Sequence, residues 1–260
     1  MRKLWWLAPV AACAALAAGC GGDDDGASGA SAEPTRLVVS AASSMTEALE
    51  ACAPQLGDAQ NADVKMSFAG SDELAAQIRQ GANVDVYAAA NTTLPDELHG
   101  DDLLGKPVEF ATNELVLAVP RDSGIDSVDD LTKEGTTVVV GSASVPIGAY
   151  TREILAKLPA VEEKAILANV RSNEPDVKGI VGKLTQGAAD AGFVYVTDVH
   201  ATGGELKAIE LPKSLEPNVT YGAAVVTKSE HHKLAQRFVD GLTQGDCAVA
   251  LREAGFGPPP

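Results

Sequence analysis

A β-branched run, a helical stretch and a second β-branched run follow one another in residues 37–68, LVVSAASSMTEALEACAPQLGDAQNADVKMSF. Strand-like runs that alternate with helices are typical of βαβ units and of a mostly parallel sheet. The same alternation predicts strands at 84–87, 115–119, 137–140, 166–170, 192–196 and 222–227, and helices at 72–80, 230–242 and 246–254. We therefore predict an α/β fold of two lobes, each a mostly parallel sheet flanked by helices.

The order of these elements indicates that one lobe is discontinuous. The late strand near 222–227 and the helices after it can return to complete the first half of the fold. We expect a first lobe of residues 36–112 and 221–257, a second lobe of residues 113–220, and a short tail at 258–260.

The composition is acidic and moderately apolar. Hydrophobic residues make up 45% of the 260 positions, which is enough for a core of this size. The formal net charge of -16 at pH 7 leaves no surface that could neutralise phosphates, so nucleic acid is not an expected partner. An aromatic content of 4% also argues against a base-stacking platform.

The first residues have the pattern of a bacterial lipoprotein signal. Arg2 and Lys3 precede an apolar run at 4–18 that ends in small residues before Cys20. We expect a signal peptide at 1–19, lipidation of Cys20 and a disordered tether at 20–35, rich in Gly, Ser, Ala and Asp. The protein would then lie on the extracytoplasmic face of the membrane. A retained membrane-spanning anchor is the alternative, but the run is shorter than the roughly 20 apolar residues a span needs.

Two cysteines, Cys52 and Cys247, follow the signal region. Export to an oxidising compartment makes a disulfide between them one expectation, and free buried thiols are the other. A cation site is not expected, because the chain has no C-x-x-C motif and His231 and His232 are adjacent, so they point apart on a helix.

Two expected helices in the first half begin with hydroxyl side chains. Ser44 and Glu47 have the spacing of a capping box at the helix that follows the first strand. Ser71 follows Gly70, which permits a tight turn, at the start of the next helix. The first turn of a helix has unpaired N–H groups and a partial positive charge, so both starts can attract an anion.

Two further helix starts lie in the second half. Pro146 suits a first helical turn, which leaves the N–H of Ile147 unpaired, and no large side chain at Gly148 blocks access to it. Asp176 is expected to be the N-cap of a helix whose first residue is Val177.

The four starts follow strand ends, two in each expected lobe. Taken singly, each is explained by ordinary helix capping. Open α/β sheets bind ligands at the carboxyl ends of their strands, so facing lobes would bring the four starts together around one cleft. Tyr195, at the end of an expected strand, is either a further donor or a core tyrosine with a satisfied hydroxyl. This arrangement would form a neutral cage for a small anion.

Several motifs in this chain resemble, in order, those of the molybdate-binding component of ABC transporters, a family with the type II periplasmic-binding-protein fold. The similarity extends over roughly residues 36–257. Two positions depart from the family pattern: Asn83 replaces a usual proline, and Ser40 replaces a larger apolar residue. The matching segments are AASSMT (41–46), FAGS (68–71), LAAQI (74–78), GANVDV (81–86), VPIGAY (145–150), DV (176–177) and GFVY (192–195).

The resemblance implies a ligand, its binding residues and a partner. The ligand would be molybdate or its near twin tungstate, delivered to the permease of an ABC transporter by a monomeric protein without a cofactor. The donors would be the hydroxyl and backbone N–H groups of two serines, two further backbone N–H groups and one phenol: Ser44, Ser71, Ile147, Val177 and Tyr195.

Three other functions are the alternatives, and one of them, a purely structural surface lipoprotein, would not need several donor-bearing helix starts. A binding protein for another oxyanion, such as sulfate, could use the same fold. A hydrolase that uses Ser44 or Ser71 is not expected, because the chain lacks G-x-S-x-G and S-x-x-K motifs and no histidine falls inside these segments.

Overall fold

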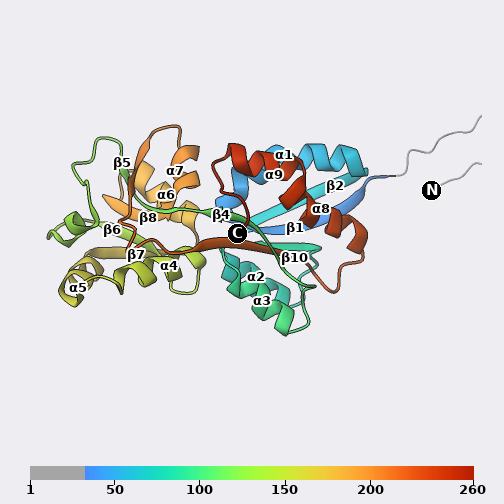
Figure 1. The fold of residues 1–260 in the computed structure, drawn as a ribbon, viewed down its shortest axis with the longest axis horizontal. Helices are drawn as coiled ribbons and strands as arrows, with labels where there is room; N and C mark the ends of the chain where they lie inside the picture. The colour runs from blue at the N-terminus through green and yellow to red at the C-terminus, as the bar shows by residue number, and fades with distance from the viewer. Residues whose placement is uncertain (1–32) are drawn as a thin grey trace, which may run out of the picture. The chain divides into compact units, whose positions relative to one another are not determined.

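The computed structural model of the protein describes residues 33–260, which form two β-sheets with flanking helices (Figure 1). The predicted signal peptide at 1–19, the lipidation site Cys20 and most of the predicted tether lie outside these residues. Among the described helices, none is both long enough and apolar enough to cross a membrane.

The first sheet has the strand order β2-β1-β3-β10-β4. Strand β1 pairs in parallel with β2 and β3, whereas β10 pairs antiparallel with β3 and β4. The bounds are β1 (Thr35–Ala42), β2 (Ala62–Ala69), β3 (Val86–Ala89), β4 (Val108–Asn113) and β10 (Val219–Val225).

The second sheet has the order β7-β6-β8-β5-β9 and repeats this arrangement. Strand β6 pairs in parallel with β7 and β8, whereas β5 pairs antiparallel with β8 and β9. The bounds are β5 (Leu115–Pro120), β6 (Val138–Gly141), β7 (Val170–Glu174), β8 (Ala191–Tyr195) and β9 (Leu206–Glu210).

Helices cover both faces of each sheet. In Figure 1, α1, α8 and α9 lie on one side of the first sheet and α2 and α3 on the other. Around the first sheet are η1 (Ser43–Met45), α1 (Thr46–Gln60), α2 (Ser71–Arg79), α3 (Thr93–Gly100), α8 (His232–Gln244) and α9 (Asp246–Glu253). Around the second are η2 (Val128–Thr132), α4 (Pro146–Leu155), α5 (Ala160–Asn169), α6 (Val177–Thr185) and α7 (Val196–Ala201).

The predicted α/β fold with two helix-flanked sheets is confirmed, and the pairing within the sheets is more mixed than the alternation indicated. Each sheet has two parallel and two antiparallel pairings. The antiparallel pairings all involve β10 or β5, which directly follow the two chain crossings between the sheets. Only the strands joined through helices keep the parallel direction that βαβ units impose.

One predicted strand was wrong. Residues 166–169 form the last turn of α5, and strand β7 begins only at Val170. The preceding segment, residues 160–165, is rich in Ala, Glu and Lys, which favour helix. A short apolar run cannot distinguish a buried helix from a strand. Strands β4 and β9 were not predicted.

Cys52 and Cys247 form a disulfide, one of the two possibilities that the sequence left open. Both cysteines are buried, Cys52 on α1 and Cys247 on α9, with their Cα atoms 5.0 Å apart. Their separation of 195 residues means that the bond joins the first and last helices of the described chain.

Candidate functional site

All five residues predicted to bind the ligand line one cavity. The cavity is bounded by η1 and the starts of α2, α4 and α6, which bring residues of both sheets together. Its lining residues are Ala42, Ser43, Ser44, Ala69, Gly70, Ser71, Ala90, Val145, Pro146, Ile147, Asp176, Val177 and Tyr195.

Ser44 lies in the short helix η1 between β1 and α1 and is buried. Its Oγ is 3.0 Å from the Oη of Tyr221, a residue 177 positions away in the sequence. The predicted capping box with Glu47 was wrong, because α1 begins at Thr46 with Met45 as N-cap and no side-chain cap. The extra 3-10 turn moves Ser44 away from the capping position and directs its hydroxyl inward.

Ser71 is the first residue of α2, and its hydroxyl also faces the interior. Its Oγ accepts a hydrogen bond from the backbone N–H of Ala90 at 3.1 Å. A hydroxyl that accepts in this way keeps its own proton for another partner. Gly70, the N-cap, lies so close to the carbonyl of Pro175 that a Cβ there would collide with it. A larger residue at 70 would therefore push the two sides of the cavity apart.

The helices from the second sheet present backbone N–H groups to the cavity. Helix α4 begins at Pro146, so Ile147 lies in the first turn, where an N–H has no intrahelical acceptor. Asp176 is the N-cap of α6, as predicted, and its carboxylate accepts from the N–H of Gly179 at 2.9 Å. Gly148 has a different role from the one expected, because it packs against the backbone of Ser142 and does not line the cavity.

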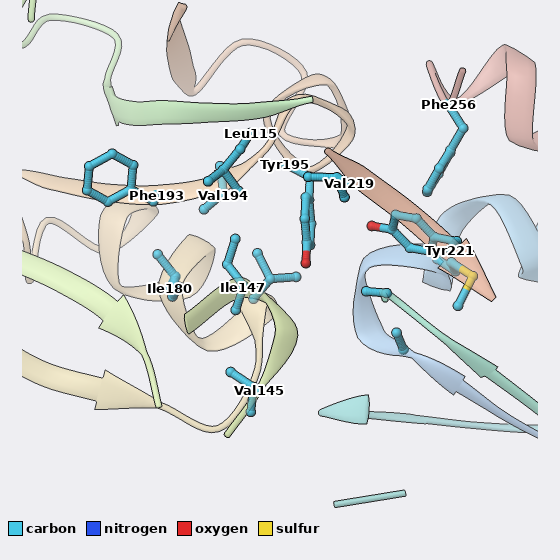
Figure 2. Close-up of a cluster of buried hydrophobic side chains, with 14 of the residues drawn as sticks. Leu115, Val145, Ile147, Ile180, Phe193, Val194, Tyr195, Val219, Tyr221 and Phe256 are labelled. Carbon is cyan, nitrogen blue, oxygen red and sulfur yellow. The ribbon is translucent and has the colours of Figure 1, made fainter. Parts of the chain in front are cut away.

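Tyr195 is the last residue of β8, and its side chain is 1% exposed. Its Oη has no hydrogen-bond partner within residues 33–260. Figure 2 shows the hydroxyl pointing to the side on which Ile147 lies, with the ring edge-on to Tyr221 at a centroid distance of 5.9 Å. Burial raises the pKa of this phenol well above its usual value near 10, so it stays a neutral donor. A buried unpaired hydroxyl that lines a cavity is well placed to bind an acceptor.

The cavity wall is nearly free of formal charge. No lysine or arginine occurs among the described residues that line it, and Asp176 already accepts from its own helix. Positive potential comes instead from the helix N-termini, whose N–H dipoles point outward. The site is therefore suited to an anion bound by oriented dipoles.

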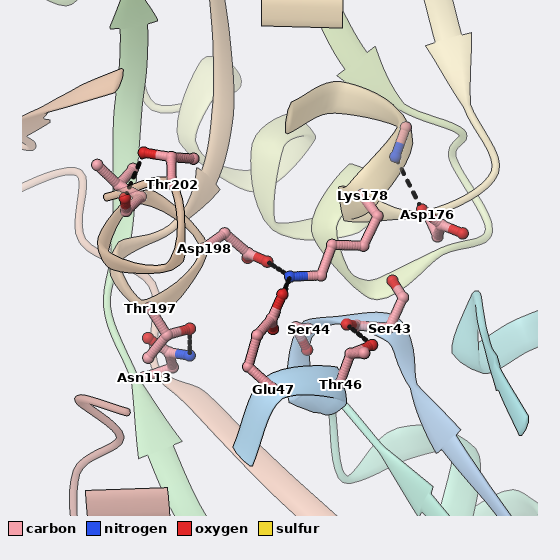
Figure 3. Close-up of polar contacts among 12 residues, drawn as sticks. Ser43, Ser44, Thr46, Glu47, Asn113, Asp176, Lys178, Thr197, Asp198 and Thr202 are labelled. Carbon is pink, nitrogen blue, oxygen red and sulfur yellow. Dashed lines mark hydrogen bonds and ion pairs between the residues drawn. The ribbon is translucent and has the colours of Figure 1, made fainter. Parts of the chain in front are cut away.

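Beside the cavity, three charged side chains join a helix of the first sheet to two helices of the second (Figure 3). The sequence did not predict this group. Lys178 Nζ lies 2.7 and 2.8 Å from the two carboxylate oxygens of Glu47, and 3.2 Å from Oδ1 of Asp198. Glu47 belongs to α1, whereas Lys178 and Asp198 belong to α6 and α7. Lys178 directly follows Val177, but no local pattern marks its partners.

Burial and the neighbouring charges shift the pKa values of Asp198 and Lys178. Burial raises the pKa of Asp198 from 3.8 to about 7, since its loss of hydration outweighs the attraction of Lys178. Burial alone would lower the pKa of Lys178, but the carboxylates of Asp198 and Glu47 together raise it. Lys178 therefore stays charged near neutral pH, while Asp198 changes charge there.

We expect Asp198 to make the fold less stable as pH rises. Its pKa is higher in the folded than in the unfolded chain, so the folded state binds more protons between roughly pH 4 and 7. The free energy of unfolding should fall over this interval by at most about 1.4 kcal/mol per pH unit from this group. Urea unfolding at several pH values should show a flatter profile for Asp198→Asn. Parallel profiles for the variant and the original protein would contradict the raised pKa of Asp198. The control is Asp96→Asn, which removes an exposed carboxylate on α3.

Comparisons with known proteins show which family this chain belongs to. The family model of bacterial extracellular solute-binding proteins matches residues 37–257. A molybdate-binding protein ModA of Mycobacterium tuberculosis (strain ATCC 25618 / H37Rv) is 35% identical over 231 residues, which cover 86% of this chain and 85% of that protein.

Two solved structures share the fold. The periplasmic molybdate-binding protein of Azotobacter vinelandii superposes with a TM-score of 0.76 at 19% identity, covering 86% of this chain and 100% of that one. The sulfate-binding protein SubI of Mycobacterium tuberculosis H37Rv superposes with a TM-score of 0.74 at 16% identity, covering 86% and 87%. The match along residues 37–257 and the 35% identity over most of both chains show that the protein belongs to the family of bacterial extracellular solute-binding proteins.

Proposed function

We propose that this protein binds molybdate, or tungstate, and delivers it to the permease of an ABC transporter. The observation that carries the proposal is the convergence of Ser44, Ser71, Ile147, Val177 and Tyr195 on one cavity, with the phenol of Tyr195 buried and unpaired within the described chain. The identity to a molybdate-binding relative supports the same ligand.

The donors suit a tetrahedral dianion. Hydroxyl and N–H dipoles at helix starts can replace the hydration shell of the anion without a mobile countercharge. The two serines come from one side of the cavity and Ile147, Val177 and Tyr195 from the other, so the ligand would be held from both sheets. We propose a binding role and not a catalytic one, because no histidine lies in the described cavity wall to activate either serine.

Another oxyanion is the second candidate, since the fold is shared with a sulfate-binding protein. Sulfate is smaller than molybdate, so in a rigid cavity sized for molybdate some donors would be left without an acceptor. Tungstate has nearly the size of molybdate and should satisfy the same donors.

Isothermal titration of residues 21–260 with molybdate, tungstate, sulfate and phosphate tests the proposal. We expect tight binding of molybdate and tungstate with similar affinities, and affinities for sulfate and phosphate that are lower by more than about a hundredfold, or about 2.7 kcal/mol. Sulfate binding as tight as molybdate binding would favour the second candidate. Absence of heat with all four anions would reject both.

We further propose that residues 36–112 with 221–257 and residues 113–220 move as two lobes that close on the ligand. Within residues 33–260 the chain crosses between the sheets only between β4 and β5 and between β9 and β10, which leaves these crossings to act as a hinge. Small-angle X-ray scattering should show a smaller radius of gyration with molybdate than without it. An unchanged radius would contradict closure.

We also propose that the protein is a monomer held outside the cytoplasm by a lipid on Cys20. The apolar run before Cys20 supports the anchor, and the family membership supports the location. Membrane fractionation should find the protein in the pellet and the Cys20→Ala variant outside it. Sedimentation of residues 21–260 as a dimer would contradict the monomer.

A further inference from the structure

A chain of buried polar side chains leads from the crossing between the sheets to the hydroxyl of Ser44. Tyr221 on β10 has its Oη 3.0 Å from Ser44 Oγ. Asn113, the last residue of β4, places its Nδ2 3.4 Å from Tyr221 Oη and 2.9 Å from Thr197 Oγ1. All four side chains are buried, so their hydrogen bonds do not exchange freely with water.

The orientation of the Asn113 amide is set by its backbone neighbour. Its Oδ1 accepts a hydrogen bond from the N–H of Glu114 at 2.9 Å. The amide nitrogen must therefore be the end that faces Tyr221 and Thr197, and an amide nitrogen can only donate. Asn113 Nδ2 thus donates a hydrogen bond to Tyr221 Oη.

The same donor-to-acceptor direction extends from Tyr221 to Ser44. Burial raises the pKa of the Tyr221 phenol well above its usual value near 10, so the phenol keeps its single proton. The amide of Asn113 occupies an acceptor position of Tyr221 Oη, so the phenol proton is free to be donated to Ser44 Oγ, 3.0 Å away. In that arrangement Ser44 is the acceptor of the pair. Ser44 then keeps its own proton for the cavity, as Ser71 does when it accepts from the N–H of Ala90.

We infer that Tyr221, oriented by Asn113, is a positioning residue that fixes Ser44 as a hydrogen-bond donor to the anion. The inference rests on the proposed function. Its consequence is selectivity, because an anion that only accepts hydrogen bonds satisfies every donor, whereas a hydrogenphosphate O–H on this side would face the proton that Ser44 directs into the cavity. Without the Tyr221 hydroxyl, Ser44 can rotate its own proton away and accept a hydrogen bond from hydrogenphosphate.

The test is Tyr221→Phe, which removes the hydroxyl and keeps the ring that packs edge-on against Phe110, Tyr195 and Phe256. We expect the affinity for molybdate to fall about tenfold and the preference for molybdate over phosphate to fall by at least the same factor. A general loss of packing would lower both affinities and leave this preference unchanged.

A double-mutant cycle separates action through Ser44 from action on the fold. In the Ser44→Ala background, Tyr221→Phe should change molybdate affinity less than about twofold. Tyr87→Phe is the matched control, because its buried phenol donates to the carbonyl of Ser71 and not to Ser44. Any effect of Tyr87→Phe should therefore persist in the Ser44→Ala background.

Asn113→Asp provides a second route if Tyr221→Phe does not fold. A carboxylate accepts where the amide donated, so Tyr221 would turn its proton away from Ser44, and we expect the same loss of molybdate preference. An unchanged preference in both variants, or a full tenfold loss in the Ser44→Ala background, would overturn the inference. Failure of the original protein to bind any oxyanion would instead overturn the proposed function.

Discussion

Replacement of both Ser44 and Ser71 by alanine is expected to weaken molybdate binding by at least about a hundredfold. Ser71 keeps its proton for the cavity, because its Oγ already accepts from the N–H of Ala90. Ser44 does the same when Tyr221 donates to it, the direction inferred above. Hydrogen bonds to a charged group contribute about 1.5–3 kcal/mol each, and about 1.4 kcal/mol corresponds to a factor of ten. Isothermal titration of the double variant measures the loss directly.

The control for this prediction is Ser40→Ala. Ser40 is a buried serine on β1 that does not line the cavity, so its replacement should leave affinity nearly unchanged. Urea unfolding should accompany the titrations, since the double variant also leaves the N–H of Ala90 without an acceptor and removes one of the two hydrogen-bond partners of the Tyr221 hydroxyl. A folded double variant that binds molybdate within about threefold of the original protein would show that these serines are not the donors.

Loss of the disulfide is expected to have the largest effect on stability. The bond between Cys52 and Cys247 closes a loop of 195 residues and joins α1 to α9. Cross-links of long loops typically contribute about 2–4 kcal/mol, and removal of a native bond costs about 2–5 kcal/mol. We therefore expect Cys52→Ala with Cys247→Ala to lower the free energy of unfolding of residues 21–260 by about 3–5 kcal/mol, measured by urea unfolding.

Reduction provides the matched control. Dithiothreitol should shift the unfolding midpoint of the original protein toward that of the double cysteine variant and leave the variant unchanged. Molybdate affinity of the folded variant should remain close to the original value, because neither cysteine lines the cavity. Equal unfolding midpoints with and without the bond would contradict a stabilising role.

The strand and helix assignments show where local sequence is informative. The starts of α4 and α6 were predicted from Pro146 and Asp176, because a proline in the first turn and an N-cap carboxylate act on their own backbone. The capping box predicted from the Ser44–Glu47 spacing was wrong, because a 3-10 turn separates Ser44 from the start of α1 and Glu47 bonds Lys178 instead. The strand predicted at residues 166–169 was wrong, because a buried helix end and a strand have similar apolar patterns.

The sequence by itself determined the alternation of strands and helices, the two helix-flanked sheets and the identity of the groups at the four helix starts, because each depends on residues close together in the chain. Only the tertiary structure decided the mixed strand directions, the ion pairs of Lys178, and the contacts of Tyr221 with Ser44 and Asn113. Apart from the Lys178–Asp198 pair, these contacts join positions more than 100 residues apart. Their existence depends on where the chain crosses between the sheets, which no local periodicity encodes.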